Sequence, residues 1–310
     1  MSSASKILAI TLLAGALACA AEQACAEELW DPHLRGVDEG MAAGALPPPG
    51  VYGVLNNYWA GYDQFDNHGN KTGVKLDALV EVPIVLWSTG IKILGADYAV
   101  AIAQPFDYTN IRLPNTAALS DNAHWGTFNT IFVPGQLSWT LPNNFYVKAG
   151  LTIYVDDASS SPARPPSGGG VGAGNGYWTL QPDLGVSWLS DGWDVSIGMS
   201  YAYNFEDSKI HRTSGQEIAV DYTVTKTIGK WTFGLGAHQE NQFNADSGSG
   251  AVSAGCPASG GCMAENYGIG PLIGYQFEGI NVLAEYNQNL HTRNDVAGTI
   301  FNIRLVMPFQ

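Results

Sequence analysis

The chain has 310 residues, a net charge of −14 and only 14% charged residues, with 37 glycines and 11% aromatic residues. A soluble domain carries roughly 25% charged residues. An acidic chain without a basic cluster argues against a nucleic-acid partner. Low charge, abundant Gly and aromatic residues and the lack of long apolar runs are typical of a membrane β-protein, because only every second residue of its strands faces lipid.

The first 26 residues have the pattern of a secretory signal peptide. Lys6 supplies the positive charge, residues 7–18 form an apolar stretch, and Ala24-Cys25-Ala26 offers a cleavage site. A lipoprotein signal that ends at Cys19 is the alternative, although the residues before Cys19 match that pattern poorly. After residue 26 the sequence has no uninterrupted apolar run of the ~20 residues that a spanning helix needs. We therefore expect an exported protein.

Residues 27–50 differ in composition from the rest and form a separate N-terminal segment. We predict a short helix around residues 34–44, which ends before Pro47-Pro48-Pro49-Gly50. The segment is too polar and too proline-bounded to be a membrane strand. We expect it at or inside the periplasmic mouth of a barrel, where it acts as a plug. A disordered periplasmic leader is the alternative.

Residues 51–310 alternate apolar and polar side chains in segments that very short and much longer connections separate in turn. In the last segment, Phe301, Ile303 and Leu305 point one way, whereas Asn302 and Arg304 point the other. The predicted strands are 51–62, 73–87, 92–106, 124–140, 144–156, 176–189, 192–205, 214–228, 230–243, 264–278, 279–292 and 297–309. An even number of strands with this rhythm predicts an all-β fold, a closed antiparallel transmembrane β-barrel with both termini periplasmic.

Aromatic side chains gather at both ends of the predicted strands. Trp188 and Trp193 lie beside a short connection, and Trp125 and Trp178 lie beside long ones. Two such girdles suit amphipathic rings at the two membrane interfaces. A soluble β-sandwich is the alternative, but it would place its large rings in the middle of the strands.

The expected mature chain keeps two cysteines, Cys256 and Cys262, in a Gly-rich connection. An even pair in an exported chain predicts a disulfide that closes a small surface loop. Two unpaired thiols are the alternative. A metal site is not expected there, because no His or second Cys pair lies nearby.

Two stretches carry a resemblance to a known family. Residues 44–52 (GALPPPGVY) and 65–70 (FDNHGN) resemble the GxLPPPGxY segment and the F-x-D-x-x-G-N loop of the family named for the MetA pathway of phenol degradation, although Asp66 comes one place early. Later stretches such as LGADYAVAIAQPF, GKWTFGLGAHQENQ and RLVMPFQ also resemble family segments, so the resemblance covers nearly the whole mature chain. It implies a proteobacterial outer-membrane barrel, of the hydrocarbon-uptake type, and no catalytic residues.

The residues themselves offer little for catalysis. Residues 198–202 (GMSYA) lack the second Gly of a nucleophile elbow and fall in mid-strand. The six His are scattered, and His211 and Ser214 are merely close together on one loop. A barrel hydrolase is therefore the weaker alternative, and we expect neither a catalytic site, nor a metal site, nor a bound cofactor.

If apolar residues face lipid, the charged residues that alternate with them should line the lumen. The candidates are Lys75, Asp77, Glu81, Asp97, Lys148, Asp183, Asp194, Glu217, Asp221, His238, Glu285 and Arg304. One interpretation is a structural ion network around Lys148 and Arg304, because buried charges must be paired or hydrated. The other is a cation-favouring lumen, since acids outnumber bases; both can hold. Asp38 and Glu39 of the N-terminal segment could meet these two cations.

Glycines and prolines in the predicted strands suggest features of the wall. Inward glycines such as Gly185, Gly198 and Gly236 leave room for a ligand or for the N-terminal segment, or merely relieve strand coiling. Four prolines, Pro83, Pro134, Pro182 and Pro271, each remove a ladder hydrogen bond. They are candidate wall defects that could open a side exit into lipid, and tolerated local bulges are the alternative.

Together these features predict an outer-membrane channel for passive uptake of small hydrophobic or aromatic compounds. A non-conducting barrel that acts as an adhesin or structural interaction protein is the alternative, and a barrel hydrolase ranks behind it. Expected partners are outer-membrane lipid and lipopolysaccharide, the barrel-assembly machinery and the solute itself. The expected organisation is a signal peptide (1–26), the N-terminal segment (27–50) and the barrel (51–310).

Overall fold

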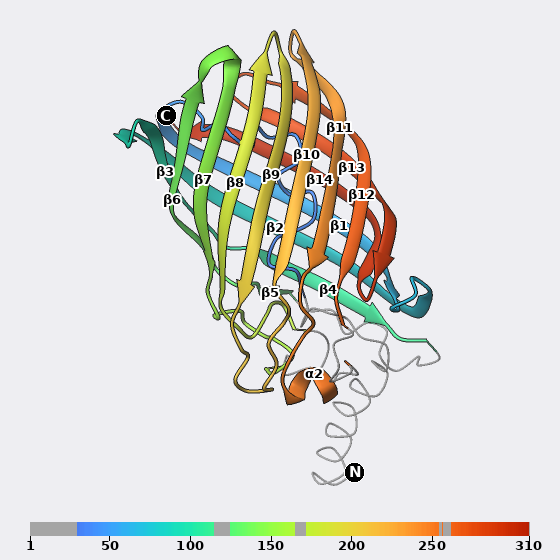
Figure 1. Cartoon of the computed structure of the whole chain (residues 1–310). Helices are drawn as coiled ribbons and strands as arrows, with labels where there is room; N and C mark the ends of the chain where they lie inside the picture. Colours follow the sequence, from blue (N-terminus) through green and yellow to red (C-terminus); the bar gives the residue numbers. More distant parts are fainter. Residues whose placement is uncertain (1–29, 115–124, 165–171, 254–255, 257–261, 310) are drawn as a thin grey trace.

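The computed structural model describes residues 30–114, 125–164, 172–253, 256 and 262–309, so the predicted signal peptide lies outside the described part. Within that part, twelve strands form a closed antiparallel barrel with strongly tilted strands (Figure 1). β1 pairs with both β14 and β2, which closes the ring. The predicted fold class is confirmed. Among the described residues, no helix is long and apolar enough to span a membrane.

Most strand bounds follow the predicted segments, but residues 107–112, which were expected in a long connection, belong to β4, and the predicted strand 124–140 divides into β5 and β6. The elements are β1 (Gly50–Phe65), β2 (Lys71–Ile93), β3 (Ala96–Ala103), β4 (Phe106–Arg112), β5 (Trp125–Thr127), β6 (Ile131–Leu141), η1 (Pro142–Asn144), β7 (Phe145–Tyr154), β8 (Thr179–Ser190), β9 (Trp193–Asn204), β10 (Glu217–Ile228), β11 (Trp231–Gln242), α2 (Ser249–Ser253), β12 (Glu265–Gln276), β13 (Asn281–Arg293) and β14 (Val296–Phe309). β4 and β5 lie outside the ring: β4 pairs with β2 beyond the end of β3, and β5 pairs with β4.

The first hairpin turn lies elsewhere than predicted. Residues 88–90 were expected to link the second and third strands, but β2 continues to Ile93 and the turn is Leu94-Gly95. Both turn residues have positive φ, +51° and +80°, as a tight two-residue hairpin requires. Gly90, also at positive φ, instead marks an irregularity in the ladder between β2 and β3.

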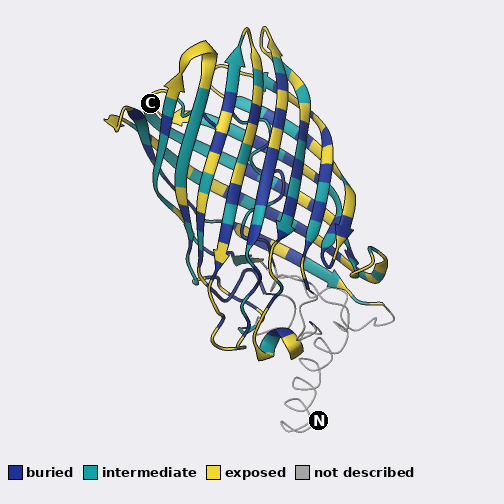
Figure 2. Cartoon of the chain, in the orientation of Figure 1, coloured by how far each residue is buried: buried dark blue, intermediate teal, exposed yellow. Residues whose placement is uncertain are grey.

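Side chains alternate between the outside and the inside of the barrel, and Figure 2 shows the resulting exposed and buried bands along the strands. Outward residues on β9 and β11 are large and apolar, for example Val195, Ile197 and Phe233. Their inward neighbours are small or polar, as the lipid-facing alternation of an outer-membrane barrel requires. Short turns gather at one end of the barrel, and the long loops with α2 gather at the other (Figure 1).

The N-terminal segment has no helix at residues 34–44, where one was predicted. Instead it forms successive turns, in which hydrogen bonds join Val37 to Leu34 and Met41 to Asp38. Gly36 and Gly40 have φ of +70° and +75°, a left-handed conformation that interrupts a right-handed helix. The spacing of the apolar residues resembled that of a helix, but these two glycines give the segment an irregular path.

The N-terminal segment runs the length of the barrel rather than lying only at its periplasmic mouth. At the long-loop end, Asn175 Nδ2 donates to the Trp30 carbonyl (2.7 Å) and Asn175 Oδ1 accepts from the Trp30 amide (3.2 Å). At the short-turn end, Ser88 Oγ donates to the Pro47 carbonyl at 2.9 Å. The segment therefore passes through the interior before it turns into β1. Its first described residue, Trp30, lies at the long-loop end, so the prediction that both termini share the short-turn end is wrong for the N-terminal segment.

Beyond the barrel, the long connection after β11 carries the helix α2 and both cysteines. Cys256 and Cys262 form a disulfide, with their Cα atoms 5.4 Å apart. Both are buried in a small apolar cluster with Ala251 of α2 and Ala264. The bridge therefore joins the stretch after α2 to the stretch before β12, outside the ring.

Candidate functional site

The wall residue Arg304 holds the N-terminal segment by its backbone. Its Nη1 donates to the Glu39 carbonyl at 2.6 Å, and its Nη2 donates to the Val37 carbonyl. Nε of the same side chain donates to Asn56 Oδ1 at 2.9 Å, and Glu285 lies 3.9 Å away. Arg304 is 1% exposed, so these acceptors compensate the desolvation of its charge.

Glu39 of the segment is fully buried against the barrel wall. Its carboxylate accepts a hydrogen bond from Asn287 Nδ2 at 2.9 Å and lies 3.2 Å from His238 Nδ1. A Cβ on Gly236 would fall 1.8 Å from Glu39 Oε2. The missing side chain at that position therefore makes the space that the buried carboxylate occupies.

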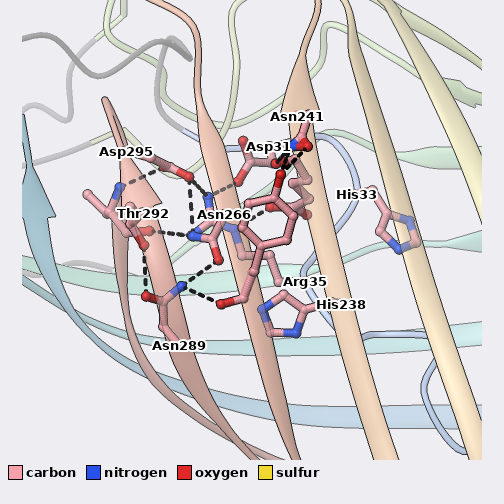
Figure 3. A network of polar contacts seen from close by, with 12 residues as sticks. Asp31, His33, Arg35, His238, Asn241, Asn266, Asn289, Thr292 and Asp295 are labelled. Carbon is pink, nitrogen blue, oxygen red and sulfur yellow. Dashed lines mark hydrogen bonds and ion pairs between the residues drawn. The ribbon is translucent and has the colours of Figure 1, made fainter. Parts of the chain in front are cut away.

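Near the long-loop end, Arg35 forms a cluster with three carboxylates (Figure 3). It pairs with Asp31 and Glu240, and its Nη2 lies 2.6 Å from Asp295 Oδ2. Asn266 Nδ2 also donates to Asp295, at 3.3 Å. Burial raises the pKa of Asp295, which lies in the loop between β13 and β14, to about 6, although Arg35 opposes this shift.

Further contacts attach the segment to β10 and to β6–β8. His33 Nε2 lies 3.0 Å from Asp221 Oδ2, which also accepts the Asp38 amide at 3.1 Å. Nearer the short turns, the Gly44 amide donates to Ser187 Oγ at 2.7 Å. A Cβ on Gly185 would fall 2.0 Å from the Ala43 carbonyl. The segment thus approaches the wall most closely at Gly185 and Gly236, where the wall has no side chain.

Between the segment and the opposite wall lies a cavity of about 590 Å³. Its apolar side is formed by β2, β3 and β6: Val80, Val82, Ile84, Leu86, Ala101, Ala103, Ile131 and Val133. The segment contributes Met41, Ala42, Ala43 and Leu46. Lining residues extend from Asp107 and Phe128 at the long-loop end to Leu86 and Leu189 near the short turns. The cavity therefore follows the barrel axis.

The candidate lumen residues divide into two groups inside the barrel. Lys148, Asp183 and Asp221 line the cavity. Glu217, His238, Glu285 and Arg304 are buried on inward positions of β10, β11, β13 and β14. Asp194, near the β8–β9 turn, accepts a hydrogen bond from Ser196. The ion network centres on Arg35 and Arg304, whereas Lys148 lies apart from it.

For three further candidates, the sequence predicted the wrong face of the strand. Lys75, Asp77 and Glu81 alternate with the buried Leu76, Ala78, Val80 and Val82, so they point outward from β2. Asp77 pairs on the outside with Arg112 of β4. The prediction failed because β2 faces the apolar cavity, which reverses the assumed rule that its apolar residues face lipid.

Asp97 was also expected in the lumen but lies at the end of the barrel. It follows the β2–β3 turn and pairs with Lys92 at 2.7 Å, with 41% of its side chain exposed. It does not line the cavity. Its charge is therefore solvated at the rim.

Pro83, Pro182 and Pro271 point outward, and beside each of them the pairing with one neighbouring strand is interrupted without a change of register. Pro134 sits in a bulge between β6 and β7. Opposite Pro83 the ladder of β2 is interrupted, because its partner changes from β3 to β4 across Gln104 and Pro105; this interruption is the break at Pro83. The Gln104 amide donates to the Pro83 carbonyl at 3.3 Å, and Gln104 Nε2 donates to the Phe128 carbonyl at 2.9 Å. This break borders the cavity, because Ala103 and Phe128 line it.

Sequence reasoning missed the anchors Asp31, Arg35, Glu240 and Asp295. The signal available was an isolated Arg in a segment expected to lie inside a barrel, where a buried cation needs acidic partners. Asp31, Glu217 and Glu240 approach one another closely enough to share a cation. Arg35 already pairs with two of these three carboxylates.

Comparison with known proteins agrees with this architecture. Residues 62–305 match the family described as "Putative MetA-pathway of phenol degradation". The crystal structure of the COG4313 outer membrane channel from Pseudomonas putida F1 superposes with a TM-score of 0.73 at 14% identity, covering 88% of this chain and 100% of that one. The translocator domain of the autotransporter NalP from Neisseria meningitidis has a TM-score of 0.49 at 11% identity, over 86% and 91% of the two chains. Among curated protein sequences, none matches.

Proposed function

The chain belongs to the MetA phenol-degradation family of outer-membrane barrels, and from this premise we propose that it is a passive channel for small hydrophobic or aromatic compounds. The observation that carries the proposal is the cavity, which runs along the barrel axis and is walled on one side by apolar residues. Water fills a polar pore readily, but an apolar wall favours solutes that gain by leaving water. The named COG4313 neighbour is likewise a channel.

Filling the cavity should slow uptake of such solutes. Ala103→Phe places a ring in the lumen, whereas Ile102→Phe changes the neighbouring lipid-facing residue, which is 51% exposed. In cells with a lipopolysaccharide-rich outer membrane, initial uptake of 1-naphthol should rise with expression of the wild-type barrel. It should fall severalfold in Ala103→Phe and stay unchanged in Ile102→Phe. Equal uptake with and without the barrel would contradict a channel and favour an adhesin or structural role.

The N-terminal segment is part of the proposal, as a plug. Its three sets of anchors, at Arg35, Asp221 and Arg304, attach it along one half of the wall and leave the cavity beside it. Deleting residues 29–46, with the cleavage site retained, should raise single-channel conductance in planar bilayers. Assembly of the deleted form is checked by its heat-modifiable migration. An assembled barrel with unchanged conductance would rule out the plug.

The break at Pro83 supports a side route as the exit of this channel. Gln104 and Phe128 bridge the break beside the cavity, and Pro83, which has no N–H group, cannot donate to the ladder there. Gln104→Cys paired with Phe128→Cys should lock the break by a disulfide. Oxidation should then slow 1-naphthol uptake reversibly, and uptake unaffected by oxidation would leave axial passage as the route.

A further inference from the structure

We propose that Lys148 binds the anionic head group of an amphipathic solute, an aryl or alkyl carboxylate, whose apolar part lies against β2, β3 and β6. This inference rests on the proposed channel function and names the solute class for the same cavity. In this proposal the cationic side of the cavity binds the carboxylate, and the apolar side binds the hydrocarbon part of the solute.

Lys148 is the only Lys or Arg among the described residues that line the cavity. Its side chain has no hydrogen-bond or ion-pair partner within the described part of the chain. The other interior cations are engaged: Arg35 with carboxylates, Arg304 with backbone carbonyls, and His33 with Asp221. The structure therefore leaves one luminal ammonium available to a ligand.

Asp183, the acid diagonal to Lys148 across the β7–β8 ladder, accepts hydrogen bonds from other donors. Thr152 Oγ1 donates to one carboxylate oxygen at 2.7 Å, and Gln181 Nε2 donates to the other at 2.8 Å. Across the β7–β8 ladder Asp183 lies opposite Gly150, whereas Lys148 lies opposite Gly185. The two charges are thus diagonal neighbours, and no ion pair forms between them in this structure.

Local geometry leaves room on one side of Lys148. Gly150, two residues further along β7, carries no side chain and lines the cavity, whereas the Ala43 carbonyl takes the space beside Gly185, which lies opposite Lys148. Ser138, opposite Lys148 on the other neighbouring strand, is turned to donate to the Gly44 carbonyl at 2.8 Å. Gln136 supplies a neutral polar group on the same lining. A carboxylate there would find a positive charge and an amide donor.

The remaining acids do not make the cavity cation-selective by count alone. Among the described residues, four acids line the cavity: Asp38, Asp107, Asp183 and Asp221. Asp221 pairs with His33, Asp183 accepts hydrogen bonds from Thr152 and Gln181, and Asp107 accepts one from Thr109. Charge-assisted hydrogen bonds are stronger in a low-dielectric surrounding than in water. A cavity of about 590 Å³ is also within the usual range for small organic ligands. An apolar body with one carboxylate fits both features.

The test compares two solutes of one shape, benzoate and benzyl alcohol, by equilibrium dialysis against the protein in lipid nanodiscs, with empty nanodiscs subtracted. Lys148→Met should weaken benzoate binding about tenfold, the loss expected for one charge-assisted hydrogen bond. Benzyl alcohol binding should stay within about twofold. Lys148→Arg should retain benzoate binding, and Lys230→Met, at the exposed β10–β11 turn, should match the wild type.

The outcomes separate the two ideas. If the wild type binds benzyl alcohol but Lys148→Met binds benzoate as tightly as the wild type, this inference is wrong and the channel proposal stands. If the wild type binds neither solute above empty nanodiscs, both are wrong. Heat-modifiable migration confirms that each variant is folded before dialysis.

Discussion

Arg304 of β14 donates a 2.6 Å hydrogen bond to the main-chain carbonyl of Glu39, which lies 265 residues earlier in the chain. Because the acceptor is a backbone atom, this hydrogen bond depends on the path of the segment's main chain and not on the identity of its side chains. Arg35 makes the reverse connection, from the segment to Glu240 of β11 and to Asp295 of the loop between β13 and β14. The barrel thus donates to the segment, and the segment donates to the barrel, along the same half of the wall.

Replacing Arg304 with Met should release the inner part of the segment. The change leaves Glu285 buried without its cation, a loss of about 3–5 kcal/mol for a broken buried pair. Proteinase K should then cleave within residues 30–46 at lower concentration, and conductance should rise. Arg293→Met is the matched control, because its pair with Glu265 is 45% and 31% exposed and such pairs contribute at most about 1 kcal/mol. Equal protease resistance of the two variants would contradict the anchor.

A methyl group at Gly185 should displace the segment by steric overlap, rather than by loss of a hydrogen bond. Its Cβ would overlap the Ala43 carbonyl at 2.0 Å, whereas a Cβ at Gly150, also inward, meets its nearest atom at 3.5 Å. Gly185→Ala should therefore cost about 1–3 kcal/mol through overpacking and increase protease cleavage of the segment. Gly150→Ala should leave both the unfolding midpoint and cleavage unchanged. If the two variants behave alike, the close approach at Gly185 is not needed for docking.

The strands could be predicted because alternation is a local signal. β9 shows Val195, Ile197 and Met199 on one side and small or polar residues on the other, and its bounds were placed within a residue or two. On β2 the same rule gave the wrong face. Whether an inward residue meets a polar or an apolar surrounding depends on a segment that is distant in sequence. Here that segment covers only one half of the wall, and β2 lies on the other half, where its inward residues line the apolar cavity.

The candidate site was accessible to sequence reasoning only in part. Lys148, Asp183 and Asp221 fell on inward positions by alternation alone. The pairing of Arg35 with Glu240 and Asp295 could not be predicted, because it depends on how far the segment enters the barrel. The helix expected at residues 34–44 would also have shortened that path, since a helix rises only 1.5 Å per residue.

The cluster around Arg35 should make stability depend on pH. The pKa of Asp295 rises from 3.8 to about 6 on folding, chiefly through burial. A raised acid pKa contributes stability that is complete below about 4 and is lost as the pH rises through about 6. The unfolding midpoint of wild-type protein in detergent should therefore fall between pH 4.5 and pH 7.5 by more than that of Asp295→Asn. Identical pH profiles would show that Asp295 does not titrate in this window.

Asp66 provides a contrast of opposite sign. Backbone amides of Asn70 and His68 donate to this exposed loop carboxylate at 2.8 Å, and the hydrogen bond from Asn70 is the largest cause of its lowered pKa. Its contribution to stability is present above its ordinary pKa and is lost as the pH falls. Asp66→Asn should therefore weaken the loop at pH 7.5 and have less effect at acidic pH, when proteolysis or hydrogen exchange of residues 63–72 is followed.

The disulfide should stabilise its loop without supporting the barrel. Cys256 and Cys262 close a small ring in the connection between β11 and β12, and a ring of this size contributes about 2 kcal/mol by restricting the unfolded loop. Replacing both cysteines with Ser should expose residues 243–264 to proteinase K, whereas the barrel's unfolding midpoint and its uptake rate stay at wild-type values. Mass spectrometry of the purified wild type should find no free thiol at either position before reduction. Alkylation of both thiols without a reductant would contradict the bridge, and a lower barrel midpoint in the double Ser variant would show that this loop supports the wall.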